Sequence, residues 1–205
     1  MKLKVCGLSK ISEVETCIEE NVNYCGFILN YPKSHRFISF EIAKKLTSIK
    51  KNFTEFVGVL VNPSEDELKK FSELKVDYFQ LYGNYNDLLL KEIKKKYKKK
   101  IISSLQIKKF DDVDNYKKIE NNSDIILWDS SGFEESISWN YNWIKNVSIG
   151  AEKMIGGNIT EDKIYDLKDL ADIIDVSGAL ETNKVKDIKK IKSFVKKINI
   201  LNEKT

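Results

Sequence analysis

The run Phe56-Val57-Gly58-Val59-Leu60-Val61, followed by Asn62-Pro63-Ser64-Glu65-Asp66-Glu67, contains one complete unit of the fold. Its first half is a short apolar run rich in valine, which predicts a buried β-strand. Its second half predicts a helix start, because Ser64 can accept a hydrogen bond from the backbone and Glu67, three residues later, completes a capping box. The stretch therefore predicts a strand that leads through a short loop into a helix.

The same unit repeats along the whole chain. Ser39 and Thr160 are further candidate caps at helix starts. Amphipathic stretches with apolar residues at helical spacing follow the apolar runs. The predicted strands are Leu3–Cys6, Tyr24–Leu29, Phe56–Val61, Tyr78–Leu81, Ile101–Leu105, Ile125–Trp128, Met154–Ile155 and Ile173–Val176.

Strands that alternate with helices indicate a parallel sheet, either open and doubly wound or closed into a barrel. Eight units favour the barrel, and the 205 residues lie near its lower size limit of about 200. No linker rich in Pro, Gly or Ser divides the chain, and both prolines, Pro32 and Pro63, come just after strands. The sequence thus predicts an α/β protein with a single (β/α)8-barrel domain over residues 1–205.

Composition narrows the class of protein. No apolar run approaches the roughly 20 residues that a membrane helix needs, and the start, Met1–Gly7, has neither the apolar stretch nor the cleavage site of a signal peptide. We therefore expect a cytoplasmic protein without a membrane partner. The three cysteines form no C-x-x-C pair and His35 is the only histidine, so neither a disulfide framework nor a metal site is expected.

The densest charged run is Lys94–Lys100, within a chain of net charge +4. It could be a nucleic-acid patch or the solvated end of a helix. We favour the solvated helix end, because no aromatic stripe and no nucleic-acid motif accompany the lysines.

Glycines gather where the predicted strands end. Those at or just beyond carboxyl ends are Gly7, Gly83, Gly132, Gly156, Gly157 and Gly178, six of the nine in the chain. Glycine allows tight turns and close approach of the backbone to a ligand. Because barrel active sites lie at this face, we expect the site there.

Two residues at this face could act as an acid and a base. Cys6 ends the first strand and could be a base or nucleophile, in which case its pKa is expected to be lowered; a small buried apolar residue is the alternative reading. Asp129 directly follows a buried strand, where a carboxylate is costly unless it is hydrogen-bonded or exposed in a site. A cap for the following turn is the alternative reading of Asp129.

Anion-binding groups are predicted at the same face. Arg36 is the only arginine among 35 basic residues, and its planar fork suits a carboxylate or phosphate better than lysine does. The loops after the seventh and eighth strands often bind phosphate in barrels. They hold Gly156 and Gly157, and Ser177-Gly178-Ala179, respectively.

These residues together resemble the phosphoribosylanthranilate isomerase family of tryptophan biosynthesis, over nearly the whole chain. The Lys-x-Cys-Gly opening and the Tyr-Pro-Lys-Ser-x-Arg stretch are the most specific motifs. The matching segments are Lys4-Val5-Cys6-Gly7-Leu8, Gly26-Phe27-Ile28, Pro32-Lys33-Ser34-His35-Arg36-Phe37, Val57–Asn62, Gln80-Leu81-Tyr82-Gly83, Gly156-Gly157-Asn158 and Asp175-Val176-Ser177 through Glu181, with Lys184 and Asp187 beyond.

The resemblance implies a TIM barrel of the ribulose-phosphate-binding type and an aldose–ketose isomerase that uses no metal or organic cofactor. The family's reaction is the Amadori rearrangement of N-(5-phosphoribosyl)anthranilate. By resemblance, Asp129 is the general acid and Cys6 the general base, and Arg36 pairs with the anthranilate carboxylate. The loops around Gly156 and Ser177 hold the phosphate, and Asp175 contacts the sugar. The family includes monomers and homodimers.

The chain departs from the family in three places. Phe133-Glu134-Glu135-Ser136 stands where a Gly-Gly-Thr-Gly loop is usual, Tyr82 replaces a histidine, and Ser177-Gly178-Ala179 replaces Ser-Ser-Gly. Two alternatives therefore stay open. One is a related phosphosugar-binding barrel isomerase with a different substrate, and the other is a catalytically impaired ligand-binding barrel.

Overall fold

The computed structural model describes residues 1–130 and 137–203, in which eight parallel strands close into a barrel in the order of the sequence. The strands are β1 (Lys2–Cys6), β2 (Tyr24–Ile28), β3 (Glu55–Val61), β4 (Tyr78–Tyr82), β5 (Lys100–Ile107), β6 (Ile125–Ser130), β7 (Glu152–Ile155) and β8 (Ile173–Val176). The predicted (β/α)8 barrel is confirmed, and every predicted strand is present with its ends shifted by at most two residues.

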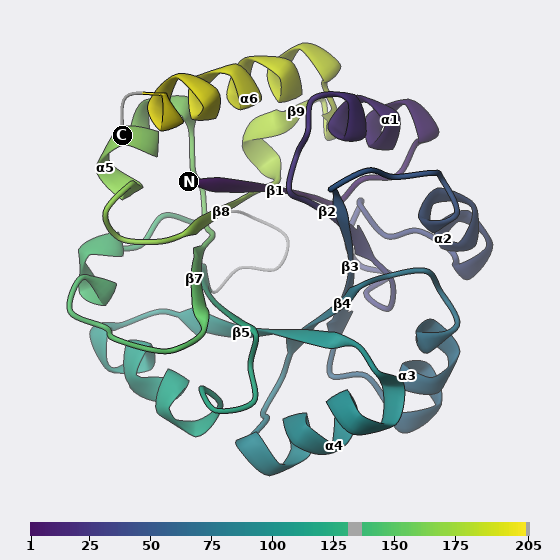
Figure 1. Cartoon of the computed structure of the whole chain (residues 1–205), viewed down its shortest axis with the longest axis vertical. Helices are drawn as coiled ribbons and strands as arrows, with labels where there is room; N and C mark the ends of the chain where they lie inside the picture. Colours follow the sequence, from purple (N-terminus) through teal and green to yellow (C-terminus); the bar gives the residue numbers. More distant parts are fainter. Residues whose placement is uncertain (131–136, 204–205) are drawn as a thin grey trace.

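Helices surround the ring of strands (Figure 1). The α-helices are α1 (Ile11–Glu19), α2 (Phe40–Thr47), α3 (Glu65–Ser72), α4 (Asp87–Tyr97), α5 (Ile164–Leu167) and α6 (Ile188–Asn202). Short 3-10 segments are η1 (Phe110–Lys118), η2 (Tyr141–Ile144), η3 (Glu161–Lys163) and η4 (Gly178–Leu180). A small antiparallel pair, β9 (Glu181–Thr182) and β10 (Val185–Lys186), follows β8.

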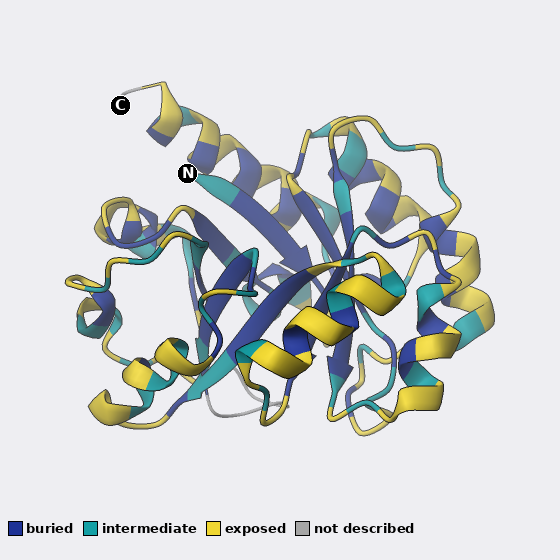
Figure 2. Cartoon of the chain, turned by 60° about the horizontal axis from the view of Figure 1, so that its bottom comes forward, coloured by how far each residue is buried: buried dark blue, intermediate teal, exposed yellow. Residues whose placement is uncertain are grey.

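Two apolar layers hold these elements together. The larger layer joins strand residues such as Phe56 and Leu60 to helix residues such as Leu90 and Phe194, so it lies between the barrel and its helices. Residues on the other face of the strands form the second layer inside the barrel, where side chains alternate along each strand. Figure 2 shows the result: the strands are buried and the outward faces of the helices are exposed.

Helix starts bear out two of the three predicted caps. The Ser39 hydroxyl accepts from the N–H of Ile42 at the start of α2. Ser64 and Glu67 form the predicted capping box, with Glu67 Oε2 2.9 Å from the Ser64 nitrogen. The prediction for Thr160 is wrong, because its side chain caps nothing and only the short segments η3 and α5 follow.

Among the described residues, no helix combines the length and apolar character needed to cross a membrane. The strand-6 loop that departs from the family, Phe133–Ser136, and Gly132 lie outside the described residues.

Candidate active site

The carboxyl ends of the strands surround a cavity of about 750 Å³, which includes the part open to solvent at its mouth. The structure brings together almost all of the predicted site residues here. Those that line the cavity are Cys6, Arg36, Asp129, Gly157, Asp175, Ser177, Gly178 and Ala179, with Tyr82 and Ser130 beside them. The remaining predicted residue, Gly156, lies directly against Asp129.

The carboxyl group of Asp129 comes from the end of β6 and is fixed at both oxygens. Oδ1 accepts from the backbone N–H of Ser130 at 2.8 Å, and Oδ2 accepts from the hydroxyl of Tyr82 at 2.6 Å. Burial and the nearby charge of Asp175 raise the pKa of Asp129 to about 6, although the two hydrogen bonds act in the opposite direction. The group can therefore hold a proton close to neutral pH, as a general acid must.

Gly156 gives this carboxyl its space. A Cβ atom at Gly156 would lie 2.6 Å from Asp129 Oδ1. The Gly156 N–H donates to the carbonyl of Trp128 at 2.9 Å, so it is engaged by the sheet rather than turned to the cavity. The role that the structure gives this glycine is clearance for the acid.

Cys6 ends β1 and is buried in the wall of the cavity. Burial raises the pKa of its thiol, the charge of Lys4 lowers it, and the charge of Asp175 raises it again. The net direction is upward, so the expectation of a lowered pKa is wrong. Desolvation of a thiolate outweighs the nearby lysine.

An ion pair lies beneath the cavity, inside the barrel. Lys4 Nζ donates to both carboxylate oxygens of Asp175 at 2.9 Å, and the Lys4 side chain is completely buried. This pair joins the first and last strands, which lie next to each other in the closed barrel. The pair gives Asp175 a fixed orientation at the cavity floor. Sequence reasoning assigned no role to Lys4 itself.

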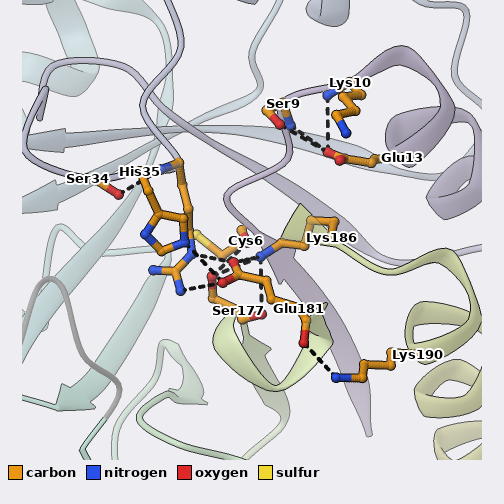
Figure 3. A network of polar contacts seen from close by, with 11 residues as sticks. Cys6, Ser9, Lys10, Glu13, Ser34, His35, Ser177, Glu181, Lys186 and Lys190 are labelled. Atoms are coloured by element: carbon orange, nitrogen blue, oxygen red, sulfur yellow. Dashed lines mark hydrogen bonds and ion pairs between the residues drawn. The ribbon is translucent and has the colours of Figure 1, made fainter. Parts of the chain in front are cut away.

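Arg36 belongs to a network of charges at the cavity wall. Its Nε and Nη2 donate to the two carboxylate oxygens of Glu181 at 2.5 and 3.0 Å. Figure 3 shows Glu181 between His35 and Lys186, whose nitrogens lie 3.1 and 2.6 Å from it. Gly7, at φ +80°, leaves room for the arginine, since a Cβ there would lie 2.4 Å from Arg36 Cδ. The predicted anion-binding arginine is thus held in place by a carboxylate.

The predicted phosphate loops are also supported by neighbouring side chains. Lys186 Nζ donates to the carbonyl of Ser177 at 3.1 Å, and the Ser177 hydroxyl donates to the carbonyl of Cys6 at 2.9 Å. On the other loop, Trp139 Nε1 donates to the carbonyl of Gly156 at 3.0 Å, and the Tyr141 hydroxyl donates to that of Gly157. These contacts fix the backbone of both loops.

Several of these supporting residues escaped sequence reasoning. Glu181 and Tyr82 were visible only as parts of motifs, and Lys186, Trp139 and Tyr141 gave no signal, because their contacts join segments that are distant in the sequence. In the described ranges, no three His, Cys, Asp or Glu side chains gather in a way that could hold a metal ion.

The fold and the position of the cavity define the class of protein, which is a (β/α)8-barrel enzyme with its site at the carboxyl ends of the strands. The family model for N-(5'phosphoribosyl)anthranilate (PRA) isomerase matches residues 3–197. The chain therefore belongs to this family of tryptophan-biosynthesis isomerases, and the resemblance seen in the sequence is confirmed.

Individual relatives agree with this assignment. The N-(5'-phosphoribosyl)anthranilate isomerase of Streptococcus mutans serotype c is 29% identical over 202 residues, covering 96% of this chain and 98% of that protein. Monomers generated from the dimeric enzyme of Thermotoga maritima share the fold at a TM-score of 0.82 and 23% identity, over 97% and 98% of the two chains. A phosphoribosylanthranilate isomerase in complex with reduced 1-(o-carboxyphenylamino)-1-deoxyribulose 5-phosphate matches at 0.80 and 23%, with the same coverage.

Proposed function

We propose that this chain catalyses the Amadori rearrangement of N-(5-phosphoribosyl)anthranilate to 1-(2-carboxyphenylamino)-1-deoxyribulose 5-phosphate, with Asp129 as general acid and Cys6 as general base. The observation that carries these roles is the Asp129 carboxyl, whose pKa of about 6 suits a proton donor and which shares one cavity with Cys6. The solved relative bound to a reduced form of this ketose supports the choice of ligand.

The reaction begins when Asp129 gives its proton to the ring oxygen of the ribose. The bond between C1 and that oxygen breaks, and the nitrogen lone pair forms an iminium with C1. The Cys6 thiolate then removes the proton from C2, and the electron pair of that C–H bond forms the C1–C2 double bond as the nitrogen becomes neutral. The resulting enolamine tautomerises to the ketone, so substrate and product are isomers and no redox partner is needed.

The remaining cavity residues bind the substrate. Arg36 pairs with the anthranilate carboxylate through the guanidinium N–H groups that Glu181 leaves unused. Gly157 on one loop, and Ser177, Gly178 and Ala179 on the other, hold the phosphate through their backbone. Gly156 contributes clearance for Asp129 instead, because its N–H already donates to the carbonyl of Trp128. Asp175 accepts hydrogen bonds from sugar hydroxyls from its position on the Lys4 ammonium.

The protonation states of the acid and base follow from burial. The pKa of Asp129 is about 6, while that of the Cys6 thiol is raised above its ordinary value. When the two groups together hold one proton, that proton therefore lies mostly on Cys6. The active state, with Asp129 protonated and Cys6 as the thiolate, is the less populated of the two. Lys4 and Lys186 both favour the thiolate and so increase the share of this active form.

The same proposal extends to the domain organisation, the location and the partners of the enzyme. Residues 1–205 form a single domain, and the enzyme works in the cytoplasm as a monomer or homodimer on a small phosphorylated substrate. No nucleic-acid or membrane partner is proposed. Lysines 94–96 form the last turn of α4, where cations favourably oppose the helix dipole.

The decisive experiment is fluorescence-monitored turnover of enzymatically generated phosphoribosylanthranilate. Cys6→Ala and Asp129→Asn are each expected to lower kcat by about 10²–10⁴-fold, the range that general acid–base groups contribute, while binding of a reduced product analogue persists. Cys17→Ala is the matched control, since Cys17 lies on the buried face of α1 and does not line the cavity.

Two results would contradict the proposal. Wild-type protein that binds the analogue without turnover would favour the ligand-binding barrel. Turnover of an aminoimidazole-carboxamide ribotide in place of phosphoribosylanthranilate would favour an isomerase with a different substrate.

A further inference from the structure

Tyr82 lies at the end of β4 with its hydroxyl against the carboxyl of Asp129. Its Oη donates to Asp129 Oδ2 at 2.6 Å and accepts from Gln80 Nε2 at 3.1 Å. A tyrosine hydroxyl has one proton. While that proton points to Asp129, the Gln80 amide must be the donor. The two hydrogen bonds therefore run in one direction: the Gln80 amide donates to the Tyr82 hydroxyl, and this hydroxyl donates to the carboxyl of Asp129, the proposed acid.

We propose that Tyr82 is a positioning residue for the reaction: its hydroxyl orients the Asp129 carboxyl toward the substrate and stabilises its ionised form between turnovers. The proposal rests on the proposed function and adds to it a residue to which the family resemblance gives no role. It stands on the geometry of the site, since Asp129 has its other oxygen fixed by the Ser130 N–H and only a glycine, Gly156, leaves room for the carboxyl in this position.

Gln80 supports this interpretation. Its side chain is completely buried, yet its Oε1 has no hydrogen-bond partner among the described residues. A buried amide with an unsatisfied oxygen is unfavourable and calls for an explanation. Orientation of the Tyr82 hydroxyl toward Asp129 supplies one, because a donor to the phenol oxygen strengthens the hydrogen bond that the phenol gives.

The charges around the pair agree with a role in orientation. Burial, then the charge of Asp129, then that of Asp175 raise the pKa of Tyr82 well above its usual value, and Cys6 adds to this. Tyr82 therefore stays protonated and acts only as a donor. The titratable groups that face Asp129 itself are Asp175 on β8, Lys4 on β1, Tyr82 on β4 and, after β6, Tyr141.

The expected sign follows from the order of the two pKa values. Because the pKa of Asp129 lies below that of Cys6, the acidic limb of the kcat/KM profile follows Asp129. Removal of the Tyr82 hydroxyl takes away a group that stabilises the carboxylate. The pKa of Asp129 then rises, and the acidic limb moves to higher pH by about one unit, as expected for one hydrogen bond to a charged group.

The test compares kcat/KM against pH for the wild type, Tyr82→Phe, Tyr82→His and Tyr78→Phe. Tyr82→Phe is expected to shift the acidic limb upward, and Tyr82→His to restore it in part, because imidazole can also donate. Tyr78 is the matched control: it is buried at the opposite end of the same strand. The substrate phosphate also titrates near pH 6. The test therefore uses the shift of the acidic limb between variants, not its absolute position.

A second comparison separates orientation of the acid from a structural role. In an Asp129→Asn background, Tyr82→Phe is expected to change kcat less than twofold, since its effect passes through Asp129. An unshifted limb, an equal loss in both backgrounds, or an equal shift with Tyr78→Phe would each overturn the proposal. If Tyr82→Phe does not fold, Gln80→Met must give a smaller shift in the same direction.

Failure of this proposal is distinguishable from failure of the proposed function. Full activity of Asp129→Asn alone would remove the acid assignment itself. An inactive Asp129→Asn together with an unmoved limb in Tyr82→Phe would remove only the role of Tyr82.

Discussion

At the scale of single residues, Glu181 has the most contacts to oppositely charged groups in the site. Its carboxylate accepts from Arg36 and Lys186 and lies 3.1 Å from His35 Nε2. Burial opposes its ionisation, but the hydrogen bond from Arg36 and the charge of Lys186 outweigh burial and lower the pKa of Glu181 to about 2. The ionised carboxylate therefore stabilises the folded state.

Glu181→Gln is expected to destabilise the protein by about 3 kcal/mol at pH 7, because it leaves the buried Lys186 ammonium without its carboxylate. A lowered pKa gives stability that is complete above the unfolded pKa of about 4.3 and is lost as the pH falls toward 2. The difference between variant and wild type should therefore shrink from pH 5 downward. Urea midpoints measured across this range test it.

The matched control is Glu65→Gln, which breaks an exposed pair with Lys96 and is expected to leave the midpoints unchanged. A Glu181→Gln deficit that is constant with pH would contradict the charge argument. It would point instead to the altered shape of the side chain.

Residue positions could be predicted from the sequence better than residue environments. Cys6 and Asp129 were found because each ends a strand, and strand ends meet at one face of a barrel. The direction of the Cys6 pKa could not be predicted, because it depends on the balance between burial and the distance to Lys4. The contact between Tyr82 and Asp129 joins β4 to β6, and no local pattern encodes it.

At the scale of elements, the segment after β6 supports the glycine loop after β7, which is the predicted phosphate site. Trp139 and Tyr141 donate to the carbonyls of Gly156 and Gly157, and their rings pack edge to face at 5.0 Å. Gly157 has φ +97°, a conformation that glycine adopts readily and other residues rarely do. The two aromatic residues thus hold this glycine turn in place beside the cavity.

Tyr141→Phe is expected to weaken binding of the product analogue by about 3–10-fold, the value of one net hydrogen bond, because the Gly157 peptide loses its support. Calorimetric titration measures the affinity. Tyr116→Phe on η1 is the matched control, since that ring packs against Trp128 away from the cavity. Equal losses in both variants would indicate general loosening rather than support of the loop.

Helix starts show where local sequence is sufficient and where it is not. Ser39 and Ser64 were predicted as caps because a hydroxyl precedes an acidic first turn and a continuous helix. Thr160 has the same local pattern, yet the chain after it forms only η3 and the four-residue α5. Ile164 and Leu167 are buried in the larger apolar layer, so tertiary packing as well as the local pattern acts on this segment.

At the scale of the whole molecule, closure of the barrel depends on pairing between β1 and β8, from Lys2 opposite Ile173 to Val5 opposite Val176. The repeat of strands and helices predicted eight units, but the ion pair inside this seam could not be predicted. Lys2 and Lys4 alternate with Leu3 and Val5, and such alternation is typical of a strand with one face in solvent. In the closed barrel that face is the interior, where the ion pair with Asp175 makes a buried lysine tolerable.

Lys4→Met therefore tests closure directly. It leaves the Asp175 carboxylate buried without its cation, and we expect a loss of about 3–5 kcal/mol in unfolding free energy, measured by urea denaturation. Lys2→Met is the control on the same strand: its pair with Glu152 is about 40% exposed, so a loss of about 0–1 kcal/mol is expected. Adding Asp175→Leu to Lys4→Met is expected to recover most of the stability, because the uncompensated charge is gone. Equal losses for Lys4→Met and Lys2→Met would show that strand pairing alone, without the ion pair, holds the barrel closed.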